Sequence, residues 1–254
     1  MKSNLSLVIL SIMVITTLVS CKKKIENCKL GKSYVSDGSS TPNSNTFAYY
    51  GNGKLKSIQY SNTERDTLVY LADTLTILHF DYRDSLMSVF LGLTNGNGFV
   101  TTGSKSNFDF NGNLTSTEYF VHEYNTEGQL TKQTISNAFG TAILSVSYAG
   151  GNSSSANLYN GATLEKKYFF FHSQAANKTG LDDMNSVFTP YFGTPSFNLL
   201  DSTHIVLVST NDTVKIKYEH TFDANDYVSK TVETYLTPGF QTKYHTYQYF
   251  DCSE

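Results

Sequence analysis

Residues 214–228 read Val-Lys-Ile-Lys-Tyr-Glu-His-Thr-Phe-Asp-Ala-Asn-Asp-Tyr-Val, and this stretch decides the fold class. From Val214 to Phe222, apolar or aromatic residues alternate with charged or polar ones, so a strand here would bury one face and expose the other to water. After Phe222 the run Asp-Ala-Asn-Asp has the composition of a turn, and Val228 would begin the next strand. The stretch therefore predicts an antiparallel hairpin.

The same hairpin pattern occurs five times along the chain. It consists of an aromatic residue, three further residues, Gly or Asp, one residue, and then Leu or Val. The five occurrences are Tyr49-Gly53-Leu55, Phe80-Asp84-Leu86, Phe108-Gly112-Leu114, Tyr124-Gly128-Leu130 and Phe222-Asp226-Val228. Gly or Asp at the last turn position supplies the positive φ that such loops need. Because the spacing between occurrences is irregular, we expect a meander of unequal hairpins instead of a solenoid.

The composition also favours strands. Aromatic residues make up 14% of the chain, with no Trp, and Thr is abundant, as is typical of a pleated, half-buried surface. Residues 205–208, Ile-Val-Leu-Val, are apolar on both faces and indicate a strand covered on both sides. We therefore predict one all-β domain, a single-domain antiparallel β-meander whose wide sheet is strongly curved or forms a partly closed barrel.

The beginning of the chain has the signature of an export signal. Lys2 is followed by an uncharged apolar run over residues 5–19 and by small residues before Cys21. This run is shorter than the roughly 20 apolar residues that a spanning helix needs. The segment Leu18-Val19-Ser20-Cys21 resembles the lipobox of lipoprotein precursors, which implies that Cys21 carries lipid and attaches the protein to a membrane. A soluble protein cleaved elsewhere is the alternative.

Three regions follow from these features. We expect a signal peptide over residues 1–20, a lipidated tether over 21–45 and the β-meander domain over 46–254. Residues 29–46 are rich in Ser, Gly, Asn and Thr and contain Pro42, as is typical of an entry loop. The formal net charge is −3 and no basic face is evident, so nucleic acid is not an expected partner.

Two cysteines remain once Cys21 is lipidated. Cys28 and Cys252 bracket the domain, and an oxidising cell envelope would permit them to pair. A loop this long could contribute about 4 to 5 kcal/mol in the chain-entropy description. Two free thiols are the alternative.

A resemblance to a known family rests on short motifs. Residues 47–58 and 124–132 resemble the Tyr-Asp (YD, RHS-like) repeat, and together with the lipobox and the ending at 244–249 they resemble Bacteroidetes lipoproteins built from such hairpins. The resemblance implies an all-β fold and supplies no catalytic residue. Lys22 stands where an aspartate commonly retains lipoproteins in the inner membrane, so we expect the outer membrane. The absence of an acidic cluster after Cys21 favours the periplasmic leaflet over the cell surface.

Catalytic and metal-binding motifs fail on their own requirements. Residues 51–56 begin like a dinucleotide loop, but Lys56 replaces the third glycine and a strand follows. The loop that begins at Asp109 has oxygen ligands yet lacks the glycine and glutamate of a calcium site. His122 lacks the second histidine of a zinc-protease helix, and Asp182 with its neighbour Asp183 are adjacent instead of facing. We therefore predict no enzyme, no metal and no cofactor.

The chain instead favours binding through aromatic groups. Residues 172–200 interrupt the hairpins, and a long apolar loop is typical of a binding loop or of a cap over one end of the sheet. The predicted binding residues are Tyr191, Phe192, Tyr244, Tyr247 and Tyr249. We expect a non-enzymatic envelope protein that binds a glycan or a partner protein at the concave face or rim. A structural or assembly lipoprotein without a ligand, and a hydrolase assembled only by folding, are the alternatives.

Five segments resemble the Asp-(Ser/Thr)-(aliphatic or Thr) acceptor of Bacteroidetes O-glycosylation. The acceptor residues would be Thr67, Thr74, Ser85, Ser202 and Thr213. Asp followed by a β-branched residue is also how a turn leads into a strand, so both interpretations stay open.

Overall fold

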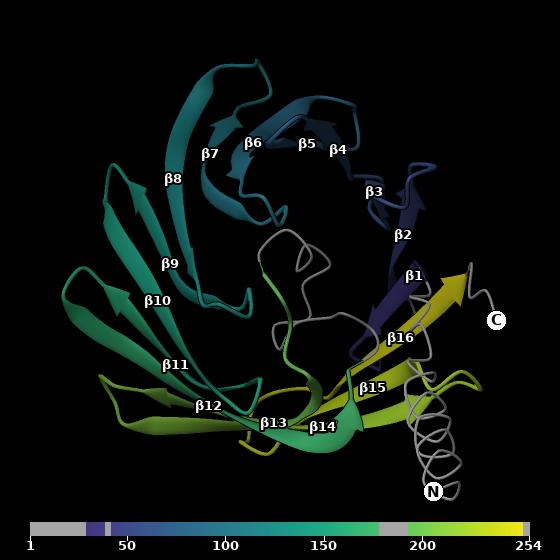
Figure 1. Ribbon diagram of the computed structural model, residues 1–254, viewed down its shortest axis with the longest axis vertical. Coiled ribbons are helices and arrows are strands. Elements are labelled where there is room, and N and C mark those ends of the chain that lie inside the picture. Colours follow the sequence, from purple (N-terminus) through teal and green to yellow (C-terminus); the bar gives the residue numbers. More distant parts are fainter. Residues whose placement is uncertain (1–28, 39–41, 178–192, 251–254) are drawn as a thin grey trace, which may run out of the picture.

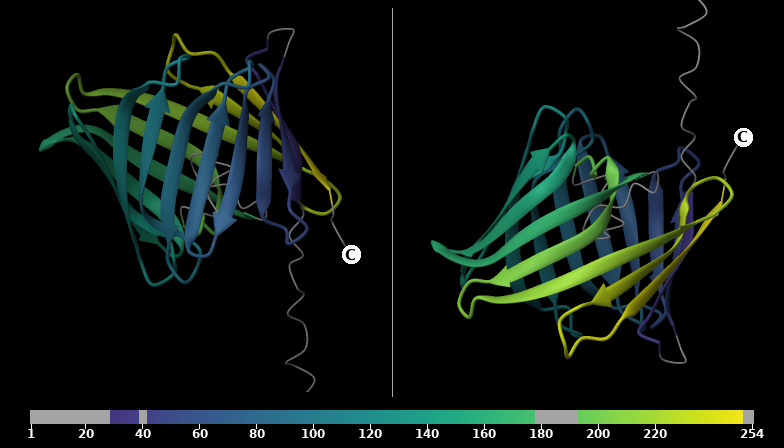
Figure 2. Two further views of the ribbon diagram at one scale, coloured as in Figure 1. Left: turned by 90° about the horizontal axis from the view of Figure 1, so that it is seen from above. Right: turned by 90° about the horizontal axis from the view of Figure 1, so that it is seen from below.

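The chain forms a closed antiparallel β-barrel. The computed structural model describes residues 29–38, 42–177 and 193–250, and within these ranges sixteen strands each pair with the next in chain order, while β16 pairs with β1. Figure 1 shows this succession round the barrel, and Figure 2 shows the green and yellow strands tilted across behind the blue-to-teal wall. The prediction of a single all-β meander is confirmed, and closure of the sheet removes its two exposed edges.

The strands are mostly seven to eleven residues long. They are β1 (Lys29–Ser36), β2 (Asn43–Tyr49), β3 (Leu55–Tyr60), β4 (Arg65–Leu71), β5 (Thr74–Phe80), β6 (Leu86–Thr94), β7 (Val100–Phe108), β8 (Leu114–Tyr124), β9 (Leu130–Asn137), β10 (Gly140–Ala149), β11 (Asn152–Asn160), β12 (Thr163–Ala176), β13 (Asn198–Leu207), β14 (Asp212–Phe222), β15 (Val228–Tyr235) and β16 (Lys243–Phe250).

The seam of the barrel corrects the predicted tether. β1 and the first three residues of β2 lie within residues 21–45, and β1 pairs with both β2 and β16, so these two segments of the predicted tether belong to the barrel. The sequence did not predict β1 because only Leu30 and Val35 provide apolar groups for its inner face. In a closed barrel the hydrogen bonds to two neighbouring strands stabilise a strand whose side chains contribute little.

The predicted hairpin turns share one geometry. In all five, the Gly or Asp residue has positive φ, from 61° at Asp226 to 83° at Gly53. The amide of the residue after the aromatic one donates to the carbonyl four residues later, as from Asp223 to Tyr227 at 2.8 Å. A register shift follows at each aromatic residue, which is the arrangement of a type I turn ending in a left-handed residue and a bulge.

Two further turns have this geometry without the aromatic residue. Thr63, between β3 and β4, and Gly98, between β6 and β7, have φ of 69° and 82°. Each occupies the turn position that Gly or Asp holds in the other five hairpins. At the second, the side-chain oxygen of Asn95 accepts from the amides of Asn97 and Phe99, at 3.0 and 3.1 Å. A side-chain acceptor at this position stabilises the turn locally, so the hairpins specify themselves before the barrel closes.

The strands alternate between an apolar inner face and a mixed outer face. One buried cluster inside β2–β7 contains Phe47, Leu55, Ile58, Leu68, Leu75 and Val100. A second cluster joins Leu199, Val228 and Tyr247 across the seam side of the barrel. In β14, Ile216 is buried whereas Lys217 and Glu219 are exposed, so the alternation expected for this strand is confirmed.

Candidate functional site

The predicted aromatic binding residues do not form one surface. Tyr244, Tyr247 and Tyr249 all lie on β16, but Tyr244 is 37% exposed on the outer face whereas Tyr247 is 7% exposed inside the barrel. Tyr249 shares the inner face and packs against Tyr227 at 5.2 Å between ring centroids. Tyr191 and Phe192 lie outside the described residues. Because side chains of a strand alternate between faces, the odd and even tyrosines of this segment are separated by the sheet.

The loop predicted over residues 172–200 is shorter than expected. β12 continues to Ala176 and β13 begins at Asn198, so both ends of the segment are strand. Residues 193–197 are described and lie at one end of the barrel interior. Cys21, Cys28, Cys252, Asp182 and Asp183 lie outside the described residues.

The candidate glycosylation residues all lie on the outer face or in a turn. Thr67, Ser202 and Thr213 are within strands, Thr74 begins β5 and Ser85 follows the turn between β5 and β6. All five are half-buried. Thr74 donates its hydroxyl hydrogen to the Leu71 carbonyl at 2.6 Å, as expected of a turn residue that leads into a strand.

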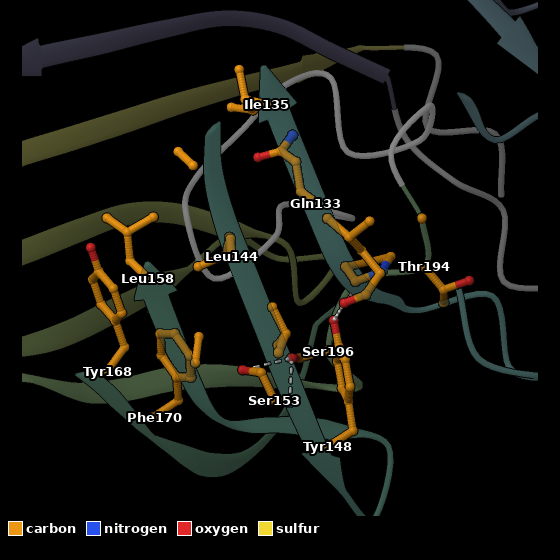
Figure 3. Close-up of a pocket in the computed structure, with 16 residues that line it drawn as sticks. Gln133, Ile135, Leu144, Tyr148, Ser153, Leu158, Tyr168, Phe170, Thr194 and Ser196 are labelled. Atoms are coloured by element: carbon orange, nitrogen blue, oxygen red, sulfur yellow. Dashed lines mark hydrogen bonds between the residues drawn. The ribbon is translucent and has the colours of Figure 1, made fainter. Parts of the chain in front are cut away.

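The barrel interior contains a cavity of about 290 Å³ between β9, β10, β11 and β12. Figure 3 shows its walls. Aliphatic side chains dominate the lining, with two aromatic rings from β12, Tyr168 and Phe170, which stack at 6.3 Å between centroids. The aliphatic lining residues of the four strands are Leu130, Ile135, Ala142, Leu144, Val146, Ala156 and Leu158. They alternate with outward residues of mixed character, such as Ser145 and Lys167 but also Ile143 and Phe169, so every second position of these strands builds the site.

Residues 193–196 close the cavity at one end. Thr194 donates its amide hydrogen to the Gly128 carbonyl at 2.8 Å and its hydroxyl hydrogen to the Glu127 carbonyl at 3.1 Å. Ser196 accepts at its hydroxyl oxygen from the Ser153 amide at 3.0 Å. These bonds fasten the segment to the turn between β8 and β9 and to the beginning of β11. We call residues 193–196 the floor of the cavity.

Asn152 and Asn198 fix the strand that leaves the floor. The Asn152 amide group donates to the Asn198 side-chain oxygen at 3.0 Å, and the Asn198 backbone amide donates to the Asn152 side-chain oxygen at 2.8 Å. Phe197 donates its amide hydrogen to the Gly151 carbonyl at 3.2 Å. The floor is therefore held from both sides by hydrogen bonds that link residues more than 40 positions apart.

Several polar groups in the lining are bonded to the protein. The Tyr148 hydroxyl donates to the Leu130 carbonyl at 2.9 Å, and the Gln133 amide nitrogen lies 2.9 Å from Nε2 of His122. Burial lowers the pKa of His122, so its ring is neutral near pH 7. A cavity with these walls offers apolar contact and only a few hydrogen bonds, which suits an apolar ligand better than a polar one.

Two networks of charged groups lie elsewhere inside the barrel. Asp66 accepts from the Tyr60 hydroxyl at 2.6 Å and lies 2.8 Å from Nδ1 of His79. On the far side, Glu233 lies 3.0 Å from Nε2 of His245 and 3.7 Å from the Lys243 ammonium. Although burial opposes it, hydrogen bonds and the nearby basic groups hold the pKa of Glu233 below its usual range. Both networks link neighbouring strands.

The loop beginning at Asp109 has a structural role. The Asp109 side chain accepts from the amides of Asn111 and Asn113, at 2.9 and 2.8 Å, which are the turn bonds described above. The Asn113 side-chain amide also donates to this carboxylate, at 3.0 Å, and this bond together with the two backbone bonds holds the pKa of Asp109 below its usual range. Within residues 29–38, 42–177 and 193–250, no group of three His, Cys, Asp or Glu residues is arranged to hold a metal ion.

Sequence reasoning did not find the cavity. Its lining comes from four consecutive hairpin strands and from the floor, which is distant in sequence. Alternation in β10 could have marked Leu144 and Val146 as inward residues, but the same pattern predicts a filled core equally well. Only the relative placement of the strands decides between the two.

A closed sixteen-strand barrel with an apolar interior site is the class of protein that the fold and the site define. No protein-family model and no curated protein matches the chain. In the part of the chain that the structure describes, no helix has the length and hydropathy needed to cross a bilayer.

Two solved structures share the fold. A porin-like protein from Bacteroides uniformis ATCC 8492 has a TM-score of 0.63 and 16% identity, covering 87% of this chain and 98% of that one. A porin-like protein from Bacteroides vulgatus ATCC 8482 has a TM-score of 0.63 and 9% identity, covering 88% and 99%. At these identities the likeness establishes the barrel fold. The resemblance to Tyr-Asp repeat lipoproteins stays a prediction.

Proposed function

We propose that this protein is a cell-envelope lipoprotein, anchored to the outer membrane through Cys21, whose barrel binds an apolar ligand in its interior. The observation that carries the proposal is the cavity of about 290 Å³ with aliphatic walls and a built floor. Protein interiors are ordinarily close-packed, with few voids larger than a water molecule, so a space of this size with apolar walls favours occupancy by a ligand.

The ligand class differs from the glycan or partner protein expected from the sequence. A sugar would need several hydrogen-bond partners inside the barrel, and the lining supplies mostly methyl and methylene groups. The aromatic residues of the lining, Tyr148, Tyr168 and Phe170, add apolar area. The sequence-based expectation of a non-enzymatic binding protein is kept, with the site moved from the rim to the interior.

The outer wall favours a barrel surrounded by water. Lys217 and Glu219 form an exposed ion pair at 2.9 Å in the middle of β14, and Lys167 on β12 and Lys230 on β15 also point outward. A barrel that crosses a bilayer presents an apolar band, where a Lys at the midplane costs about 2–4 kcal/mol. The lipid on Cys21 would therefore be the attachment to the membrane, with the periplasmic leaflet as the expected side.

Exposed apolar residues also lie on the outer face, on β4 and β6, on β8 (Tyr119 and Val121) and on β12 (Phe169 and Phe171). Leu71 is 74% exposed, and Leu91 and Leu93 are 47% and 48% exposed, on β4 and β6. The register partners of these β6 leucines on β5 and β7 are polar. Leu91 pairs with Thr76 and Ser104, and Leu93 pairs with Thr74 and Thr102. This part of the wall is amphipathic, so the proposal does not require it to contact hydrocarbon.

Replacing either of two alanines by phenylalanine tests the proposed site. Ala156 is 3% exposed and lines the cavity, whereas Ala162 is exposed in the turn between β11 and β12. We expect Ala156→Phe to weaken binding of the neutral fluorescent probe N-phenylnaphthylamine by about tenfold or more, and Ala162→Phe to leave it unchanged. Equal binding by wild type and Ala156→Phe, with both folded by circular dichroism, would remove the interior site.

The anchor and its side need separate tests. Metabolic labelling with an alkyne fatty acid should mark the wild-type chain and not Cys21→Ser. Protease added to intact cells should leave the protein uncut if it faces the periplasm. Digestion on intact cells would contradict the periplasmic placement without affecting the interior site.

A further inference from the structure

We infer that the ligand of the interior cavity is an anionic amphiphile, with its hydrocarbon chain in the cavity and its negatively charged head beside Lys166. The inference rests on the proposed interior site and adds the chemical class of the ligand. It starts from the register of β12, which places Lys166 on the same face as the lining residues Tyr168 and Phe170.

Lys166 lies next to the cavity wall on both sides. It pairs directly with Leu158 of β11, which lines the cavity, and with Leu207 of β13. Side chains at directly paired positions have Cβ atoms about 4.5–5.5 Å apart, so the Lys166 stem contacts the wall. Lys166 therefore continues the inward row formed by Gln133, Leu144 and Leu158.

Lys166 is also at the end of the cavity away from the floor. The floor contacts Ser153 near the level of Phe170, and Lys166 is four residues, about 13 Å, from Phe170 along β12. A lysine can lay its methylene groups along an apolar wall while its ammonium group stays near water. The cation is thus placed where the head of a bound chain would emerge.

Among the residues that the structure describes, the charge of Lys166 has no ion-pair partner. None of the sixteen lining residues is charged, and among the described residues no carboxylate lies within ion-pair distance of Lys166. The neighbouring Glu165 is exposed on the sheet's other side, where its carboxylate accepts from the Asn160 amide at 3.1 Å. A half-buried cation above an apolar cavity favours an anionic group as its partner.

A photoreactive fatty acid tests the inference directly. The full chain in lipid nanodiscs would be irradiated with dodecanoate that carries a diazirine at its far end, and the labelled peptides identified by mass spectrometry. We expect labels within β9–β12 and residues 193–196. Unlabelled dodecanoate should compete at least about tenfold better than dodecanol, because only the carboxylate pairs with Lys166.

Adjacent lysines provide a matched control. Lys167 follows Lys166 on β12 and points outward, so both substitutions remove one charge from the same strand. We expect Lys166→Met to reduce labelling about tenfold, Lys166→Arg to retain it and Lys167→Met to have no effect.

The outcomes separate this inference from the proposed site. If Lys166→Met labels like Lys167→Met, or if dodecanol competes as well as dodecanoate, the anionic head is overturned. Should labelling of β9–β12 nevertheless disappear in Ala156→Phe, the apolar interior site stands. Labelling that is insensitive to Ala156→Phe would overturn both.

Discussion

Adjacent glycines at the turn between β10 and β11 allow a sharp test of how the floor is held. Gly150 and Gly151 both have positive φ, 58° and 80°. A Cβ atom on Gly150 would meet nothing within 4 Å, whereas one on Gly151 would lie 2.2 Å from the Phe197 ring. Substituting each by alanine therefore separates the backbone penalty, which both share, from the contact with the floor segment.

The expected magnitudes follow from these two effects. A left-handed conformation costs a non-glycine residue about 1–2 kcal/mol, so Gly150→Ala should lower the free energy of unfolding by about that amount. Gly151→Ala adds an overpacking penalty of about 1–3 kcal/mol, for a total of about 2–5 kcal/mol. Urea unfolding of the full chain, followed by far-UV circular dichroism, measures the difference.

A second substitution identifies Phe197 as the cause. Phe197 is 55% exposed, so Phe197→Ala alone should change stability little, and in the Gly151→Ala background it should restore about 1–3 kcal/mol. If Gly150→Ala and Gly151→Ala are equally destabilising, or if Phe197→Ala restores nothing, the described packing of the floor against this turn is wrong.

Three further predictions concern the wall of the barrel. Gly103→Ala would place a Cβ atom 2.7 Å from the Leu91 carbonyl oxygen and should cost about 1–3 kcal/mol in urea unfolding, whereas Gly96→Ala meets nothing within 4 Å and should be neutral or stabilising by up to about 1 kcal/mol. The pKa of Glu233 is depressed in the folded state, so the stability that its carboxylate contributes is present above the ordinary value of 4.5 and is lost as pH falls through the lower folded value. Glu233→Gln should lower the free energy of unfolding by about 1.5–3 kcal/mol at pH 7 and flatten the acid limb of a stability-versus-pH curve. A Cys28–Cys252 bridge should shift the non-reduced chain on a gel and lose up to about 5 kcal/mol of stability on reduction, and an unchanged midpoint after reduction would contradict it.

The described partners nearest to those cysteines favour the bridge. Lys29 and Phe250 are register partners at the seam between β1 and β16. A disulfide at this seam would join the two ends of the domain. It would therefore close a long loop in the unfolded state and lower the entropy of that state strongly.

Turn chemistry made the hairpins predictable from the sequence. The aromatic residue, the side-chain acceptor and the left-handed Gly or Asp act within six residues, so the pattern does not depend on the rest of the fold. Thr63 shows the limit, because a threonine with positive φ has no local signal and is fixed by the strands on both sides. β1 could not be predicted for a related reason. Its pairing partner β16 lies next to it in the barrel but at the other end of the sequence.

The site depended on information that no local pattern contains. Leu130, Leu144 and Leu158 look like ordinary core residues, and whether they fill the interior or surround a cavity depends on the barrel's circumference. The floor is a stronger case, because Thr194 and Ser196 bind residues more than 40 positions away. Sequence reasoning marked residues 172–200 as unusual and could not say that residues 193–196 line the barrel interior.

The side of the wall that carries the apolar residues decides what such a barrel can do. In a membrane-spanning barrel the apolar band faces outward and the lumen is polar. Here the inner face is apolar at the cavity, where Leu144, Val146 and Phe170 face inward. The outer face is mixed, because it carries Lys217 and Glu219 as well as exposed apolar side chains such as Phe169 and Phe171. A one-residue register shift in any strand would exchange the two faces, so the bulges at the hairpin ends also specify which face is apolar. The same arrangement of strands thus supports an interior apolar site only because each hairpin fixes its register at the turn.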